Sequence, residues 1–356
     1  MWLYLLKRLL LMFPTLLGVL TLTFLVTQFV PGGPIDNALA QLNAEGARSD
    51  GMSEDGAEGG ATWNYSGRQG ISDEQRQLLA DQYGFDQPPL TRYFKMLRSY
   101  LRFDLGQSYF RQQSVWTLIL SKLPVSLSLG AWTLFLTYMI SVPLGIRKAM
   151  HTGSRFDLLS TLLILLGYAL PSFILGVLLI VVFGGGSLWE LFPMRGLVSD
   201  NWDELGLYAR FVDYFWHATM PVTALVVSSL AVKTLLTRNV FLDEVSSQYV
   251  ISARAKGVGE RGILWRHVLR NALLPLVTSF PATFTAAFFT GTLLIETLFS
   301  LDGLGLLSYE SINTRDYPVV LGTLWVFTIV GLLVKLAADV AYVLVDPRIA
   351  FDGHAD

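Results

Sequence analysis

The sequence predicts an all-α polytopic membrane protein with six transmembrane helices and both termini cytoplasmic. Only 15% of the 356 residues are charged and 52% are hydrophobic, whereas soluble domains are about 25% charged. Six runs are long and apolar enough to cross a bilayer, which takes about 20 helical residues. The predicted spans cover residues 9–30, 126–146, 158–183, 218–237, 272–295 and 319–345.

The distribution of basic residues gives the predicted orientation. If the N-terminus lies inside, the inner segments hold twelve Lys and Arg residues, and the two short outer loops hold three. The long loop after the first span is not counted, because long segments cross the membrane regardless of their charge. Short inner loops carry the excess of basic residues, so both termini are predicted to be cytoplasmic.

The first span, residues 9–30, has an alternative interpretation as a signal peptide. Lys7 and Arg8 precede an apolar run, and Ala38-Leu39-Ala40 resembles a cleavage site. The apolar run covers 22 residues, longer than the roughly 7–15 residues of a signal peptide. We therefore predict an uncleaved helix in a first segment of residues 1–30, and cleavage would leave the other five spans unchanged.

Residues 31–125 form a large insertion on the outer side. Within it, residues 43–72 are rich in Gly, Asp and Glu and are predicted to be flexible, because they cannot bury enough apolar area to fold. Residues 88–103 are predicted to form an amphipathic helix. Its basic face carries Arg92, Lys95, Arg98 and Arg102, and its apolar face carries Phe94, Leu97 and Leu101. This helix either packs on the outer leaflet or the spans, or contacts a docking protein or substrate.

Several kinds of chemistry are excluded by motif. The chain has no Cys, and its four His lack metal-ligand spacing. It contains neither a GxxxxGK[ST] phosphate loop nor a GxSxG nucleophile elbow. We therefore predict that the chain is not an enzyme and binds no cofactor or metal.

Charged residues within the spans are few. Lys233 is interpreted as a lysine that extends to the membrane surface, and Lys335 and Asp339 as an i, i+4 pair. A proton relay in an ion-coupled carrier is the alternative.

Helix-breaking residues are better candidates for a transport pathway than these charges. Candidate pore or gating residues are Pro171, Ser172, Pro281 and Gly291, because a proline frees a carbonyl inside a membrane helix and a glycine permits close packing. Ordinary kinking is the alternative.

Residues 239–271 form a basic, Gly-punctuated inner loop. One helix is predicted over residues 243–256, with Gly257 as its left-handed cap, and a second over residues 260–271. Small residues at Ala253, Ala255 and Gly257 would let a partner approach, and Arg254 and Lys256 would supply charge for an acidic groove. A merely solvated basic loop is the alternative.

The run Ala253-Arg254-Ala255-Lys256-Gly257, followed by residues 266–275 (RHVLRNALLP), resembles the EAA loop of binding-protein-dependent ABC importers. The similarity is to the dipeptide, oligopeptide and nickel branch. Ile251 stands where the general pattern has an acidic residue. Further matching stretches are residues 7–26, 83–86, 103–108, 171–173, 302–305 (DGLG) and 346–348. Residues 31–34, 154–157 and 241–245 resemble the B-type permease of Yej-type importers, a subgroup that takes up oligopeptides and peptide antibiotics such as microcin C.

The resemblance implies half of the pore of a type I ABC importer with a large periplasmic insertion. Its core permease domain would cover residues 126–345 and its cytoplasmic tail residues 346–356. Residues 253–257 would couple to an ATPase, supported by Arg266, His267, Arg270 and Asn271.

The implied partners are a second homologous permease, two ATP-binding domains or one fused ATPase that binds ATP and Mg, a periplasmic substrate-binding protein, a peptide and the lipid bilayer. No nucleic acid is implied. The competing hypotheses are an ion-coupled secondary transporter and a membrane scaffold.

Overall fold

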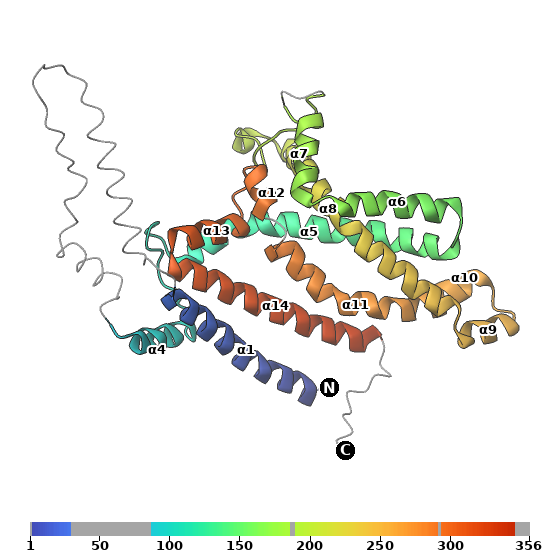
Figure 1. The fold of residues 1–356 in the computed structure, drawn as a ribbon, viewed down its shortest axis with the longest axis horizontal. Helices are drawn as coiled ribbons and strands as arrows, with labels where there is room; N and C mark the ends of the chain where they lie inside the picture. Colours follow the sequence, from blue (N-terminus) through green and yellow to red (C-terminus); the bar gives the residue numbers. More distant parts are fainter. Residues whose placement is uncertain (1, 30–86, 186–188, 291–292, 346–356) are drawn as a thin grey trace, which may run out of the picture. The chain divides into compact units, whose positions relative to one another are not determined.

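The computed structural model describes residues 2–29, 87–185, 189–290 and 293–345 (Figure 1). Within these ranges the regular structure is helical, and the only β-type pairings are two isolated bridges, between Gln107 and Ser114 and between Gly184 and Phe192. The helices are α1 (Trp2–Phe29), α4 (Pro89–Tyr100), α5 (Val115–Met150), α6 (Arg155–Ala169), α7 (Ser172–Phe183), η2 (Trp202–Glu204), α8 (Leu207–Val245), α9 (Gln248–Ala255), α10 (Glu260–Ile263), η3 (Leu264–Val268), α11 (Leu269–Thr285), η4 (Ala286–Thr290), α12 (Leu293–Leu298), α13 (Leu304–Thr314) and α14 (Tyr317–Val345).

The chain divides into two compact units. The first, here called the core unit, comprises Met1–Met12, Lys122–Leu307 and Ile329–Asp356, and the second unit comprises Phe13–Ser121 and Ser308–Thr328. Four helices, α1, α5, α13 and α14, contribute residues to both.

Five helical stretches are long and apolar enough to cross a membrane. They are Leu6–Phe29, Val115–Met150, Leu207–Val245, Glu260–Leu298 and Tyr317–Ala341. The pair Arg155–Ala169 and Ser172–Phe183 brings the number to six if it counts as one span. The predicted number of spans is therefore met only with this pair included.

The helix expected over residues 158–183 is not a single span-like rod. Its two parts, α6 and α7, are bent by 97° at the break. Pro171 causes the break, because proline disfavours helical backbone at the residue before it, and Leu170 is accordingly extended, with φ −91° and ψ 124°. Each part alone is too short for a hydrocarbon core of about 30 Å, since the 12 residues of α7 rise about 18 Å.

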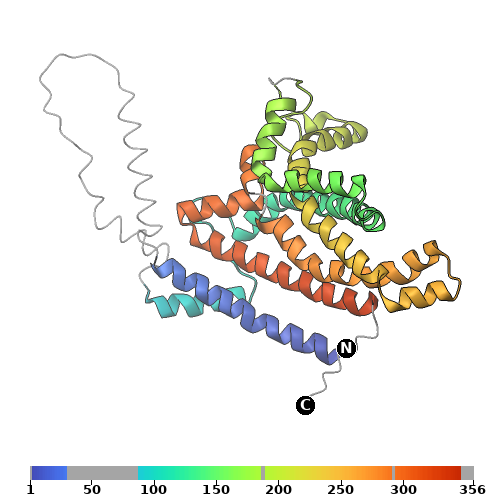
Figure 2. The same ribbon diagram turned by 45° about the vertical axis from the view of Figure 1, so that its right-hand side comes forward.

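Helix α8 is central to the core unit and packs against α6, α7 and α11 (Figures 1 and 2). A buried apolar cluster joins residues of α8, such as Met220 and Leu225, to Leu129 of α5 and to Ile295 of α12. Helices α5 and α8 also approach closely at Gly145, where a Cβ atom would lie 2.8 Å from the Thr234 carbonyl oxygen. A residue larger than Gly would separate the two helices.

In the second unit, α4 occupies most of the predicted amphipathic helix and packs on α1. The Tyr93 hydroxyl lies 2.6 Å from the Thr21 hydroxyl, and Arg92 donates a hydrogen bond of 2.8 Å to Gln28. Leu90 and Phe94 stay exposed. The predicted flexible segment 43–72, Gly291 and the 346–348 motif lie outside the described residues.

Candidate functional site

Residues 239–271, the 239–271 loop, comprise the end of α8, the short helices α9, α10 and η3, and the first residues of α11 (Figures 1 and 2). The helix predicted over 243–256 was wrong at its start, because α8 continues to Val245 and α9 begins only at Gln248. Ser247 separates them with extended backbone at φ −71° and ψ 154°. Serine favours such a break because its hydroxyl competes for backbone groups, and here it donates to the Glu244 carbonyl oxygen at 2.7 Å.

Gly257 ends α9 in the way the sequence predicted. Its φ is +79°, a conformation that glycine adopts without steric cost. The Gly257 N–H donates to the Arg254 carbonyl at 2.9 Å, and the Val258 N–H donates to the Ala253 carbonyl at 3.2 Å. These two bonds are those of a Schellman motif. No atom lies within 4 Å of the position a Gly257 Cβ would take, so the turn faces open space.

The inner face of the 239–271 loop is fixed by an apolar cluster, here called the anchor cluster. Its buried members are Ala149 of α5, Phe241 of α8, Val250 of α9, Ile263 of α10, Val268 of η3 and Ala272 of α11. Burial of an aliphatic or aromatic side chain contributes about 1.5–3 kcal/mol. The loop is therefore packed firmly onto the ends of α5, α8 and α11.

Polar contacts also fix the loop. The Glu244 carboxylate accepts hydrogen bonds from the Tyr249 hydroxyl, at 2.6 Å, and from the Asn271 amide, at 3.4 Å. Burial raises the pKa of the Tyr249 phenol, and the bond to Glu244 raises it further, so Tyr249 remains a donor. Asn271 thus connects α11 to the end of α8. Among the described residues, no side-chain hydrogen bond or ion pair is formed by the other predicted support residues, which are Arg266, His267 and Arg270, all exposed.

The residues predicted to contact a partner do not all face outwards. Arg254, Ala255, Lys256 and Gly257 are exposed, whereas Ala253 is half-buried against the anchor cluster. Of these, Arg254 is already paired.

The Arg254 guanidinium donates to both carboxylate oxygens of Glu260, at 2.7 and 3.2 Å. This bond raises the pKa of Arg254. Lys256 is consequently the basic residue of the turn whose charge remains open to a partner.

The sequence did not predict that three apolar side chains of the loop are exposed. Ile251 is 51% exposed, Val258 38% and Trp265 68%. Single exposed apolar residues are ordinary, but apolar side chains beside exposed basic residues are also what a contact surface offers. The helical period of the sequence does not predict this exposure of Trp265, because the buried Ile263 and Val268 lie five positions apart across the π-helical segment η3.

Pro171 and Ser172, two of the candidate pore residues, lie at the 97° bend, and Pro281 lies inside α11.

The interpretation of the charged span residues needs correction. Lys233 does not extend to the membrane surface but is buried, donates to the Ser279 hydroxyl at 3.0 Å and lies over the Tyr138 ring. Asp339 pairs with Arg8 at 2.5 Å rather than with Lys335.

A buried carboxylate, Glu296 of α12, was also missed. Its side chain is fully buried and accepts hydrogen bonds from the Ser126 hydroxyl at 3.1 Å and the Leu306 N–H at 2.8 Å. A Cβ atom on Gly303 would lie only 2.5 Å from this carboxylate. The DGLG segment therefore needs glycine because it wraps around an acidic side chain. Among the described residues, no group of three His, Cys, Asp or Glu side chains could hold a metal ion.

Comparison with known proteins agrees with this architecture and with the resemblance seen in the sequence. Residues 141–351 match the family model described as binding-protein-dependent transport system inner membrane component. The inner membrane ABC transporter permease protein YejB of Escherichia coli O157:H7 is 52% identical, with 99% of each chain covered. The peptidoglycan transport system permease protein YejB of Agrobacterium fabrum is 51% identical, with 98% of each covered.

The similarity extends to oligopeptide permeases. The oligopeptide transport system permease protein AppB of Bacillus subtilis is 31% identical over 98% of this chain and 99% of its own length. The chain therefore belongs to the family of binding-protein-dependent transport system inner membrane components, and it is a multi-pass permease subunit of an ABC transporter in the inner membrane.

Proposed function

We propose that this chain forms half of the pore of a type I ABC importer that carries oligopeptides from the periplasm to the cytoplasm. The observation that carries the proposal is the exposed, Schellman-capped helix α9, which the anchor cluster fixes to the ends of three helices. The substrate class is supported by relatives named for oligopeptide and peptidoglycan transport. Both termini and the 239–271 loop would face the cytoplasm, and residues 31–125 would face the periplasm.

In this proposal α9 and the Gly257 turn are the coupling helix, which a cleft of a separate ATPase binds. ATP and Mg are bound there, and this chain binds no cofactor and catalyses no reaction. A homologous permease supplies the other half of the pore, and a periplasmic binding protein delivers the peptide. Closure of the two ATPase domains, separate or fused, moves the coupling helices together, and the spans follow as rigid bodies from inward-open to outward-open.

The test is transport by the complete complex in sealed vesicles. Peptide uptake should require ATP and the binding protein and persist when ion gradients are collapsed. Uptake that an ion gradient drives without ATP would contradict the proposal and favour a secondary transporter.

The surface of the 239–271 loop gives a separate prediction. Trp265→Ala should weaken ATPase binding about 30-fold, because truncation of an interface tryptophan typically costs about 2 kcal/mol or more. Co-purification of the ATPase at graded concentration measures this. Trp189→Ala is the matched control, since Trp189 is 63% exposed but precedes α8, on the proposed outer side. Equal binding by the two variants would exclude Trp265 from the interface.

A further inference from the structure

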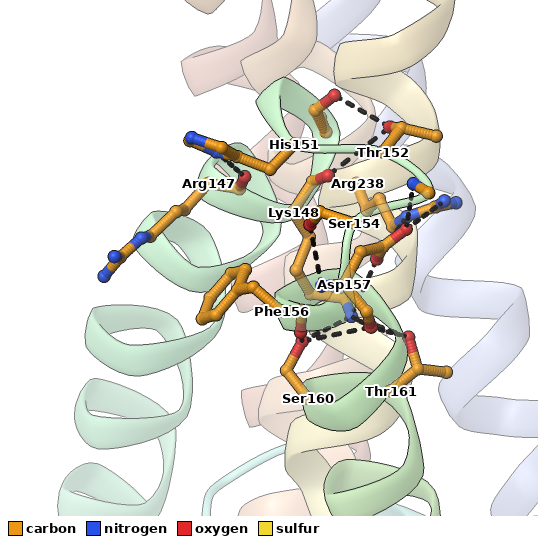
Figure 3. A network of polar contacts seen from close by, with 12 residues as sticks. Arg147, Lys148, His151, Thr152, Ser154, Phe156, Asp157, Ser160, Thr161 and Arg238 are labelled. Carbon is orange, nitrogen blue, oxygen red and sulfur yellow. Dashed lines mark hydrogen bonds and ion pairs between the residues drawn. The ribbon is translucent and has the colours of Figure 1, made fainter.

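A buried polar cluster lies where the ends of α5, α6 and α8 meet (Figure 3). It contains Lys148 from α5, Asp157 from α6 and Arg238 from α8. The Lys148 side chain is fully buried, and Asp157 is nearly so. We refer to these three residues as the ion cluster.

Lys148 connects α5 to the first turns of α6. Its ammonium group donates to the Asp157 carbonyl oxygen at 2.7 Å, the Ser160 hydroxyl at 2.8 Å and the Thr161 hydroxyl at 2.6 Å. It also lies 3.0 Å from a carboxylate oxygen of Asp157. The three protons of the ammonium group are shared among four acceptors on α6, which hold the end of α5 to α6.

Asp157 connects α6 to α8. Its two carboxylate oxygens accept from Nε and Nη2 of Arg238, at 3.1 and 2.9 Å. The Gly153 N–H, in the turn between α5 and α6, donates to the same carboxylate at 3.2 Å. A bidentate pair of this kind fixes orientation as well as distance. Figure 3 shows the side chains converging from the three helices.

Stability alone does not explain the ion cluster. Desolvation offsets much of the attraction in a buried ion pair, and well-packed apolar residues are often as stable or more so. The ion cluster does fix the position of α6 relative to α8, because the bidentate pair between Asp157 and Arg238 tolerates little rotation or sliding.

The ion cluster adjoins the anchor cluster of the 239–271 loop. Ala149 follows Lys148 directly in α5, and Phe241 lies about one turn beyond Arg238 in α8. Both Ala149 and Phe241 belong to the anchor cluster that packs against Val250 of α9. The same two helix ends therefore hold α9 through apolar contacts and α6 through the ion cluster.

We infer that the ion cluster passes movement of the 239–271 loop to the bent pair α6–α7. Asp157 and Arg238 act as positioning residues, which hold the first turn of α6 to the helix ends that α9 moves. The inference rests on the proposed function, in which α9 receives force from an ATPase. The bend at Pro171 then lies within the helix pair α6–α7 that is moved.

Arg238→Gln in the assembled complex is the direct test. Arg238 is 22% exposed, and its loss leaves the Lys148–Asp157 pair intact, so the variant should fold. ATPase activity without binding protein should stay within about twofold of wild type, whereas stimulation by the peptide-loaded binding protein should fall about tenfold. Arg238→Lys should restore part of the stimulation, and Asp157→Asn should reproduce the loss.

Glu310→Gln is the matched control, because it breaks an ion pair with Arg111 whose side chains are 46% and 33% exposed. Its stimulation should remain normal.

A second readout follows the movement itself. The chain has no native cysteine, so a single label at Leu178→Cys reports on α7 alone, where Leu178 is 48% exposed. The label signal should change on ATP binding with wild-type Arg238 and stay constant in Arg238→Gln.

The possible outcomes separate the two claims. An unstimulated wild-type complex would refute the proposed function. A stimulated wild type would overturn the inference if Arg238→Gln were equally stimulated, or if basal and stimulated rates fell in equal proportion. Failure of both Arg238→Gln and Asp157→Asn to assemble would also overturn it, since the ion cluster would then serve folding alone.

Discussion

Gly257→Trp is expected to leave the chain inserted in the membrane but abolish binding-protein-stimulated ATP hydrolysis by the complex. The Gly257 backbone has φ +79°, and a residue with a Cβ pays about 1–2 kcal/mol in that region. An indole at the turn would also hold the partner away from the backbone. Reconstituted complexes report insertion, ATPase co-purification and stimulated hydrolysis on the same sample.

Two controls separate the effect of backbone strain at residue 257 from the effect of side-chain size. Gly259 has φ −64° and open space around its Cβ position, so Gly259→Ala should be neutral where Gly257→Ala is not. Gly106 has φ +79° and equally open surroundings in the second unit. Gly106→Trp should therefore carry the same strain and leave ATPase binding unchanged. Normal stimulation by Gly257→Trp would remove the turn from the proposed interface.

Glu296→Ala is expected to destabilise the core unit by about 3 kcal/mol or more, because it removes the hydrogen bonds of a fully buried carboxyl group and leaves the half-buried Leu306 N–H without its acceptor. Thermal unfolding in detergent, followed by the fluorescence of the nine Trp residues, measures the shift. Gly303→Ala should show a smaller loss, since a Cβ 2.5 Å from the carboxylate forces the glutamate to move.

Asp302→Ala provides the matched control for Glu296→Ala. Asp302 belongs to the same DGLG segment but pairs with Lys122 at the surface, with its side chain 66% exposed. Exposed pairs contribute about 0–1 kcal/mol. A loss as large for Asp302→Ala as for Glu296→Ala would show that the segment, and not the buried carboxylate, determines stability.

The predicted spans followed from properties that are local in the sequence. Run length and composition located them, and glycine chemistry located the cap of α9. Helix ends were harder, because α5 begins at Val115, well before the apolar run from residue 126. Residues 115–125 are largely apolar but are interrupted by Ser121, Lys122 and Pro124, and a helix continues through such residues once packing supports it.

The missed features depend on contacts between residues far apart in the chain. Ser126 and Glu296 are separated by 170 positions, so the sequence around Glu296 does not indicate which residue it contacts. The 97° bend at Pro171 was expected only as a kink, because its size depends on packing, as where Gly176 of α7 meets Leu298 of α12. The pairing of Arg254 with Glu260 was not predicted, because the two side chains meet only when the Gly257 turn reverses the direction of the chain.

A single cysteine at Lys256 tests the central claim most directly, because the chain has no other cysteine and Lys256 is exposed on the turn. In the assembled complex, Lys256→Cys should cross-link to the ATPase. A membrane-impermeant thiol reagent should label it only in inverted vesicles. Labelling from the outside of intact cells, or no cross-link in a complex that hydrolyses ATP, would contradict the account.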